Sequence, residues 1–243
     1  MAQVSPVVSP SYIIYQEAGI VKAKNGLTGL IDFSGTDAST VIQSAINALP
    51  TTGGMVFLKR GTYHLNPMVK LKSYVSFIGE GWNTVLECTG KFIGLRLETV
   101  EWVTIAGLLF RGIKASDSQP VILIGRNTGT GATDSHNITL FNVKVEGGLD
   151  AIQVIDTMKY RFYKVWTIGA YRNGIWCWAS GTPNYLYGIF LDVESTDNGG
   201  YGIHVENVRD MQRVLYCHLI NNGDSGLRFK DCYDRGFDHS LRL

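Results

Sequence analysis

Apolar and polar residues alternate with a period of two in short runs that recur along most of the chain. In each run a small or turn residue precedes an apolar, any, apolar triplet, and the lead apolar residues are Leu95, Val121, Ile152, Ile175, Ile203 and Leu227. The spacings between them are 26, 31, 23, 28 and 24 residues. Strands this short cannot bury a face alone, so the pattern predicts repeated coils that stack on one another.

Each repeat also contains a second strand-like run. These runs are Val103–Ile105, Ile138–Leu140, Tyr160–Phe162, Leu186–Val193 and Val214–Leu219. The two-residue period and the β-branched and aromatic residues argue against helices, and glycine-containing breakers separate the runs. The fold class predicted is all-β, a right-handed single-stranded parallel β-helix whose coils lie about 4.8 Å apart.

One segment has a helical pattern instead. Val41, Ile42, Ala45, Ile46 and Leu49 share one face of a helix predicted over 38–49, which follows the capping candidate Asp37 and ends before Pro50. An amphipathic helix just before a β-solenoid is well placed to cover its open end. We therefore expect an N-terminal arm with short strands over 1–33 and a β-helix with its capping helix over 34–243.

This opening region resembles that of the pectate-lyase-like β-helix proteins, which include polysaccharide lyases, galacturonases and viral tailspikes. The resemblance is carried by Gly35–Pro50, Gly53–Leu58, Gly61–Leu65 and Val75–Gly81. It implies the fold and a polysaccharide as substrate class, but no reaction, because these segments contain none of the catalytic residues. The Asn-Thr-Asp and Gly-His-Gly motifs of galacturonases and the Arg-x-Pro-x-x-Arg motif of pectate lyases are absent from the sequence.

Alternation along the first strand of each coil predicts two outward columns of side chains. The first is Arg96, Ile122, Gln153, Trp176, His204 and Arg228, and the second is Glu98, Ile124, Ile155, Trp178, Glu206 and Lys230. Indole rings stack on the C–H faces of sugars, and nearby charges bind hydroxyl or uronate groups. The predicted substrate-binding residues are Trp176, Trp178, His204, Arg228 and Lys230. Alternatively, the apolar members form a stripe that the turn at 126–137 or another subunit covers.

The second strands predict another outward set, in which Asp192 and Glu194 lie two positions apart and Asp192 neighbours His218. A strand separates such residues by roughly 6.6 Å, which permits an inverting hydrolase pair. If the protein is an enzyme, a polysaccharide lyase or glycoside hydrolase, the candidate catalytic residues are Asp192, Glu194 and Glu206. Solvated surface carboxylates are the alternative interpretation.

The turns contain a recurrent asparagine, at Asn173, Asn198 and Asn222, which is expected to hydrogen-bond along the stack. Asp197 and Asp224 in the same turns are the candidate ligands for Ca²⁺, but they lack a clustered set of further oxygen ligands. The sequence therefore predicts no cofactor and no metal site.

Composition narrows the class of protein. The 243 residues are 45% hydrophobic and 18% charged, with a formal net charge of +1, which suits one large core and gives no general attraction to nucleic acid. The four cysteines form no Cys-x-x-Cys pair and are expected to be buried free thiols. No apolar run is long enough for a membrane span, and no signal peptide is visible.

These patterns predict a protein that binds a polysaccharide or surface glycan, with glycan cleavage left open. The alternative is a structural spike or fibre subunit of a virion without catalysis; both functions place the protein outside the cell or on a virion. The last coil begins at Leu227 and at the average spacing would end near position 253, whereas the sequence ends at Leu243. We therefore expect a longer polypeptide or a C-terminal end covered in a homo-oligomer, with a trimer favoured.

Overall fold

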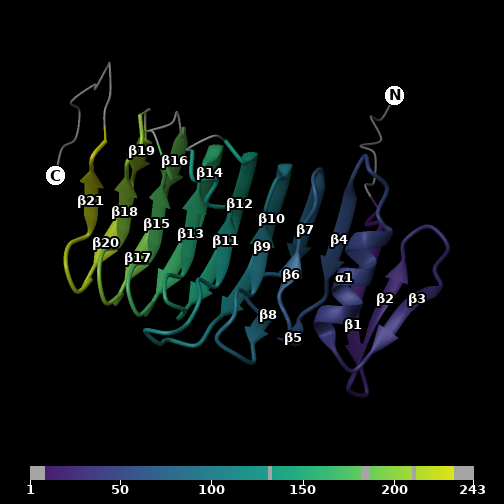
Figure 1. The fold of residues 1–243 in the computed structure, drawn as a ribbon. Helices are drawn as coiled ribbons and strands as arrows, with labels where there is room; N and C mark the ends of the chain where they lie inside the picture. The colour runs from purple at the N-terminus through teal and green to yellow at the C-terminus, as the bar shows by residue number, and fades with distance from the viewer. Residues whose placement is uncertain (1–8, 131–132, 182–186, 210–211, 233–243) are drawn as a thin grey trace, which may run out of the picture.

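The computed structural model describes residues 9–130, 133–181, 187–209 and 212–232. Parallel coils stack along one axis from the N-terminal to the C-terminal end (Figure 1). A small sheet takes one strand from each coil, in the order β21-β18-β15-β13-β11-β9-β6. Its strands are β6 (Val69–Lys70), β9 (Leu95–Leu97), β11 (Ile122–Ile124), β13 (Ile152–Ile155), β15 (Ile175–Trp178), β18 (Ile203–Glu206) and β21 (Leu227–Lys230). The predicted parallel β-helix is confirmed.

The remaining strands form a 14-stranded large sheet. They are β1 (Tyr12–Glu17), β2 (Ile20–Asn25), β3 (Ile31–Gly35), β4 (Gly54–Leu58), β5 (Gly61–Leu65), β7 (Val75–Gly79), β8 (Thr84–Cys88), β10 (Glu101–Arg111), β12 (Ser135–Glu146), β14 (Thr157–Ile168), β16 (Gly188–Leu191), β17 (Glu194–Thr196), β19 (Gln212–Leu215) and β20 (His218–Ile220). The predicted second strands of the repeats lie here. The alternating run predicted at 239–243 lies outside the described residues.

The large sheet bends at one corner in every later coil. Gly107, Asn142 and Lys164 have positive φ inside β10, β12 and β14, and Asp192 and Tyr216 occupy the same corner between shorter strands. The corner divides the sheet into a first arm before it and a second arm after it. Each coil therefore presents three outward faces: the small sheet and the two arms.

This corner corrects one sequence prediction. Asp192 has a φ of 56° and lies between β16 and β17, so it does not share a strand with Glu194. The register of β17 and β20 pairs Glu194, rather than Asp192, with His218. The prediction that Asp192 and His218 are neighbours was wrong, because a corner residue in the left-handed region interrupts the alternation of side chains.

The core is filled by the inward residues of all three sides of the coil. In the small sheet Leu95, Ile122, Ile152, Ile175 and Ile203 follow one another in register and are all fully buried. The prediction that Ile122 and Ile124 belong to the outward columns was wrong by one residue. The register places Leu123 outward beside Arg96 and Gln153, since a shift of one residue exchanges the two faces of a strand.

Helix α1 (Ala38–Ala48) packs at the N-terminal end of the stack, as predicted (Figure 1). The Asp37 carboxylate accepts a hydrogen bond of 2.9 Å from the Ser39 amide, and Val41, Ile42, Ala45 and Ile46 are buried. Strand β1 pairs in parallel with β4, and β2 and β3 extend the sheet in antiparallel fashion. The predicted domain division at residues 33 and 34 falls inside β3 and stays a prediction. No helix in the described part of the chain has the length and apolar character of a membrane span.

Candidate functional site

Aromatic and charged side chains gather on the outward face of the small sheet, over β15, β18 and β21. The register aligns Trp176 with His204 and Arg228, and Trp178 with Glu206 and Lys230. Neighbouring parallel strands lie about 4.8 Å apart, so each column places its side chains in lateral contact. We call the surface formed by these six residues the aromatic face. The structure thus brings together all five predicted substrate-binding residues and one predicted catalytic residue, Glu206.

The rings of the aromatic face are stacked. The ring centroids of Trp176 and Trp178 lie 5.3 Å apart with planes inclined by 19°, and those of Trp176 and His204 lie 6.1 Å apart at 15°. The guanidinium carbon of Arg172 lies 4.4 Å from the Trp176 ring centroid. The three nearly parallel rings therefore form a bent row, in which Trp178 and Trp176 follow strand β15 and His204 continues from Trp176 along the solenoid axis.

A buried carboxylate holds Arg172 in this position. Asp150 is fully buried and accepts hydrogen bonds from Nε and Nη2 of Arg172, at 3.0 and 2.5 Å. It also accepts bonds of 3.1 and 2.9 Å from the backbone and side-chain amides of Asn173. Asp150 and Arg172 were absent from the predicted site residues. A signal was available, because Asp150 and Asn173 each precede the first residue of a small-sheet strand, Ile152 or Ile175, by two positions.

A second cation is held at the other side of His204. Arg228 donates a hydrogen bond to the Tyr201 hydroxyl, and its guanidinium carbon lies 4.9 Å from the Tyr201 ring centroid. The Tyr201 and His204 ring centroids are 5.0 Å apart. Tyr201 was also absent from the predicted set, because it lies in the turn before β18 rather than on the strand.

The pKa values of His204 and Glu206 both lie below those of free side chains. Burial lowers the pKa of His204, and the charges of Arg228 and Lys230 lower it further against the opposing effect of Glu206. Burial acts to raise the pKa of Glu206, but the hydrogen bond and charge of Lys230 lower it overall. At neutral pH the face therefore presents a neutral imidazole beside an ionised carboxylate, with 4.0 Å between His204 Nε2 and Glu206 Oε2.

Four buried nitrogen atoms on the small sheet's outward side have no hydrogen-bond partner among the described residues. They are Nε1 of Trp176, Nε1 of Trp178, Nε2 of His204 and Nε of Arg96. Leaving a buried polar group unpaired costs about 1–3 kcal/mol. Three of the four nitrogens belong to one row, so a ligand with suitably placed oxygen atoms would satisfy several at once.

The remaining predicted catalytic residues lie elsewhere. Glu194 lies on the second arm of the large sheet, where its Oε2 accepts a 2.9 Å hydrogen bond from Trp166 Nε1, and Asp192 lies at the corner. Glu206 is on the small sheet, so Glu194 and Glu206 belong to different faces of the solenoid. Asp192 and Glu194 do not lie on one strand, because β16 ends at Leu191 and β17 begins at Glu194.

The turn residues take part in ladders of hydrogen bonds. Asn198 Nδ2 donates to Asn222 Oδ1 at 2.9 Å, whereas Asn173 bonds to Asp150 in the preceding coil and accepts from the Tyr201 amide. Asp197 accepts a hydrogen bond from Asn221. In the part of the chain that the structure describes, no three histidine, cysteine, aspartate or glutamate side chains cluster in a way that could hold a metal ion.

Comparisons with known proteins agree with this architecture. Residues 32–104 match the family model described as rhamnogalacturonase A/epimerase, pectate lyase-like. No curated protein sequence matches the chain.

Three solved structures have a similar fold. The A-module of the mannuronan C-5 epimerase AlgE4 from Azotobacter vinelandii is 15% identical, with a TM-score of 0.50 over 80% of this chain and 70% of that one. The catalytic domain of a GH87 α-1,3-glucanase in complex with nigerose is 14% identical, with a TM-score of 0.57 over 96% and 40%. ORF18 of Geobacillus virus E2 is 10% identical, with a TM-score of 0.52 over 88% and 54%. The chain thus spans between 40% and 70% of these proteins.

Identities this low show the fold alone. The match over residues 32–104 covers the region in which the sequence resembled pectate-lyase-like proteins, and the similar structures extend that likeness over the coils that follow. The expected resemblance is confirmed: residues 32–104 match a pectate lyase-like family model, and the chain as described is a parallel β-helix.

Proposed function

We propose that the protein binds a polysaccharide or surface glycan along the aromatic face. The observation that carries this proposal is the row of stacked rings, Trp176, Trp178 and His204, whose buried ring nitrogens have no partner among the described residues. Sugars present apolar C–H faces to aromatic rings and hydroxyl or carboxylate oxygens to N–H groups. A saccharide would therefore both stack on the rings and accept hydrogen bonds from their nitrogen atoms.

The charges on either side of the row support the same ligand class. Arg172 and Arg228 flank the rings, and Lys230 with Glu206 adds a cation and an anion within the face. Guanidinium groups bind carboxylate oxygens in a bidentate manner and hydroxyl oxygens singly. Because the coils repeat along the axis, an extended glycan lying parallel to it meets one coil after another.

The similar proteins add support to this proposal. They are a mannuronan C-5 epimerase, an α-1,3-glucanase in complex with nigerose, and a viral protein. A location outside the cell or on a virion surface accords with a glycan ligand. Catalysis on this face would involve Glu206 beside His204, because Glu194 lies on another face.

The test is a Trp176→Ala, Trp178→Ala double variant titrated with nigerose and with oligomannuronate by calorimetry. Truncating a central tryptophan anchor costs about 2 kcal/mol or more, so we expect affinity to fall at least about 30-fold while the fold is retained. Trp102→Ala is the matched control, since Trp102 is 58% exposed and lies in β10 of the large sheet, not on the small sheet. Unchanged affinity in the double variant would remove the aromatic face as the binding site.

Reducing-end and unsaturated-product assays on the same proteins separate binding from cleavage. A Glu206→Gln variant that keeps affinity and loses product formation supports a catalytic role for Glu206. Product formation by the wild type that persists in Glu206→Gln and stops in Glu194→Gln assigns cleavage to the second arm instead.

A second candidate function, a structural spike subunit, is favoured by an apolar column on the first arm of the large sheet. The register aligns Ile13, Phe57, Ile78, Ala106, Phe141, Tyr163, Leu191 and Leu215 on the outward side of eight successive strands. Phe141 is 50% exposed and Leu215 is 46% exposed. A continuous apolar column of this kind gains stability when another copy covers it.

We propose that copies of the chain associate through this apolar column, with a trimer favoured. Light scattering should then give three times the chain mass of 26.8 kDa, and Phe141→Asp should reduce it to the mass of one chain. A single-chain mass for the wild type at high concentration would contradict this association and leave glycan binding unaffected.

A further inference from the structure

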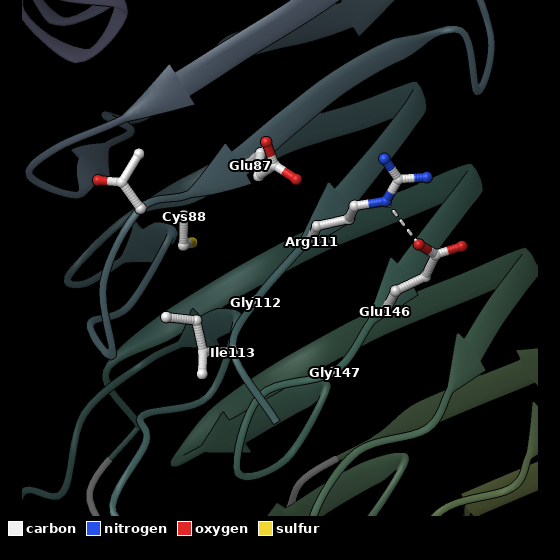
Figure 2. A pocket seen from close by; sticks show the side chains of 8 residues that line it. Glu87, Cys88, Arg111, Gly112, Ile113, Glu146 and Gly147 are labelled. Carbon is white, nitrogen blue, oxygen red and sulfur yellow. Dashed lines mark hydrogen bonds and ion pairs between the residues drawn. The ribbon is translucent and has the colours of Figure 1, made fainter. Parts of the chain in front are cut away.

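A pocket of about 300 Å³ lies on the second arm of the large sheet, whereas the aromatic face belongs to the small sheet. Figure 2 shows the side chains that line this pocket. Three charged residues from successive coils line it in register, namely Glu87 of β8, Arg111 of β10 and Glu146 of β12. Cys88, Thr89 and Ile113 complete the lining with two glycines. Its size is at the lower end of the range for small-molecule sites, which suits one ring rather than a chain.

Part of the pocket wall is bare backbone, at two glycines whose packing leaves no room for a side chain. Gly112 and Gly147 follow Arg111 and Glu146 directly, and Gly147 has a φ of 76°. A Cβ atom on Gly147 would lie 2.3 Å from the Gly112 carbonyl oxygen, which is a severe overlap. Bare backbone therefore forms this part of the pocket, next to the charged side chains.

The charged groups leave binding capacity free. Arg111 uses only Nε for its 2.7 Å bond to Glu146, and its terminal nitrogens point away from that carboxylate (Figure 2). Within the described residues these two nitrogens have no hydrogen-bond partner. On the other side, Glu87 contacts His64 Nδ1 through Oε2, at 3.0 Å, and its other oxygen is without a partner among the same residues.

Neighbouring groups fix Glu146. Lys144 bonds to Glu146 Oε1 at 2.8 Å, and its ammonium group lies 5.8 Å from the Trp82 ring centroid. Trp82 packs edge-on against Trp166 at 4.6 Å. Burial acts to raise the pKa of Glu146, but hydrogen bonds from Arg111 and Lys144 lower it overall, so this carboxylate is ionised at neutral pH.

These groups select for a neutral ligand with adjacent hydroxyls. A guanidinium donor lies between two carboxylate acceptors, which matches a vicinal diol that donates to the carboxylates and accepts from Arg111. The charges of the two glutamates balance those of Arg111 and Lys144. An anionic ligand would therefore be repelled by the carboxylates, and a cationic ligand would be repelled by Arg111 and Lys144. Neither ionic class gains from the site as a whole.

We propose that this pocket is a second saccharide site, which takes a single neutral sugar ring and is independent of the glycan-binding face on the small sheet. The protein would then hold glycan at two places on different faces of the solenoid. Two sites on one rigid body raise avidity for a branched or crowded polysaccharide.

The test is saturation-transfer NMR on the whole chain with methyl α-glucoside, methyl α-mannoside and methyl β-galactoside, each at millimolar concentration. We expect at least one glycoside to bind, and binding to fall about tenfold or more in Arg111→Met and in Glu87→Gln. Arg60→Met is the matched control, since Arg60 is exposed and lies outside the pocket. The thermal unfolding midpoint of each variant verifies that the fold is retained.

Two further arms separate this site from the aromatic face and test its preference for neutral sugars. Binding should persist in the Trp176→Ala, Trp178→Ala double variant, and methyl glucuronide and glucosamine should bind more weakly than the neutral glycosides. The proposal is overturned if no neutral glycoside binds the wild type, if Arg111→Met binds as well as the wild type, or if binding disappears only in the tryptophan double variant.

Discussion

Replacing Asp150 by alanine is expected to lower the free energy of unfolding by about 2–6 kcal/mol, because two buried amide donors each lose about 1–3 kcal/mol with their acceptor. Asp150 is fully buried, and its removal leaves the amides of Asn173 without an acceptor and the Arg172 guanidinium without its counter-ion. Glycan affinity should fall as well, because Arg172 is no longer held over Trp176. Urea unfolding, followed by circular dichroism, measures the first effect and calorimetry the second.

Asp117→Ala is the control for this experiment. Asp117 also forms an ion pair, with Lys91, but its side chain is 68% exposed. Exposed ion pairs contribute about 0–1 kcal/mol, so this variant should unfold close to the wild type. Equal destabilisation in the two variants would show that burial of Asp150 is not the source of its effect.

Replacing Phe162 by alanine is expected to cost a similar amount, about 3–5 kcal/mol. Phe162 is fully buried, and its ring centroid lies 5.6 Å from that of Tyr160 and 5.5 Å from that of Phe190 in the next coil. The cavity therefore weakens a contact within one coil and a contact between coils. In a solenoid the interfaces between repeats supply much of the stability, so the loss is not confined to one strand.

The matched control is Tyr171→Ala, an aromatic truncation at a residue that is 49% exposed. Substitutions at exposed positions outside special contacts usually change stability by less than about 0.5 kcal/mol. The measurement is the midpoint and slope of urea unfolding for each variant. A loss below about 1 kcal/mol in Phe162→Ala would mean that the coil interior collapses around the missing ring.

Much of the fold followed from the sequence because local pattern and global packing agree in a repeat. Ile175 and Cys177 lie two positions apart and are both buried, as are Ile203 and Val205 at the equivalent positions of the next coil. The aromatic face followed from the same alternation, since its residues lie between those inward positions. Helix α1 was predictable because its apolar face and its Asp37 cap are both local signals.

The register failed where alternation is absent. Pro120–Ile124 is a continuous apolar run, and Val121, Ile122, Leu123 and Ile124 are all buried in the structure, so the sequence gives no phase there. Only the hydrogen bonding of β11 to β9 and β13 decides that Ile122, rather than Val121, aligns with Leu95 and Ile152.

The sequence by itself determined the coil, its inward residues outside β11, and the neighbours Trp176, His204 and Arg228, because these depend on strand alternation and a regular repeat. The tertiary structure alone decided the corner at Asp192, which no shared residue type marks, and with it the pairing of Glu194 with His218. It also decided the contact of Arg172 with Asp150 across 22 positions, and the pocket between Glu87 and Glu146. These features arise between coils, where the stacking distance, and not the order of residues along one strand, sets which side chains meet.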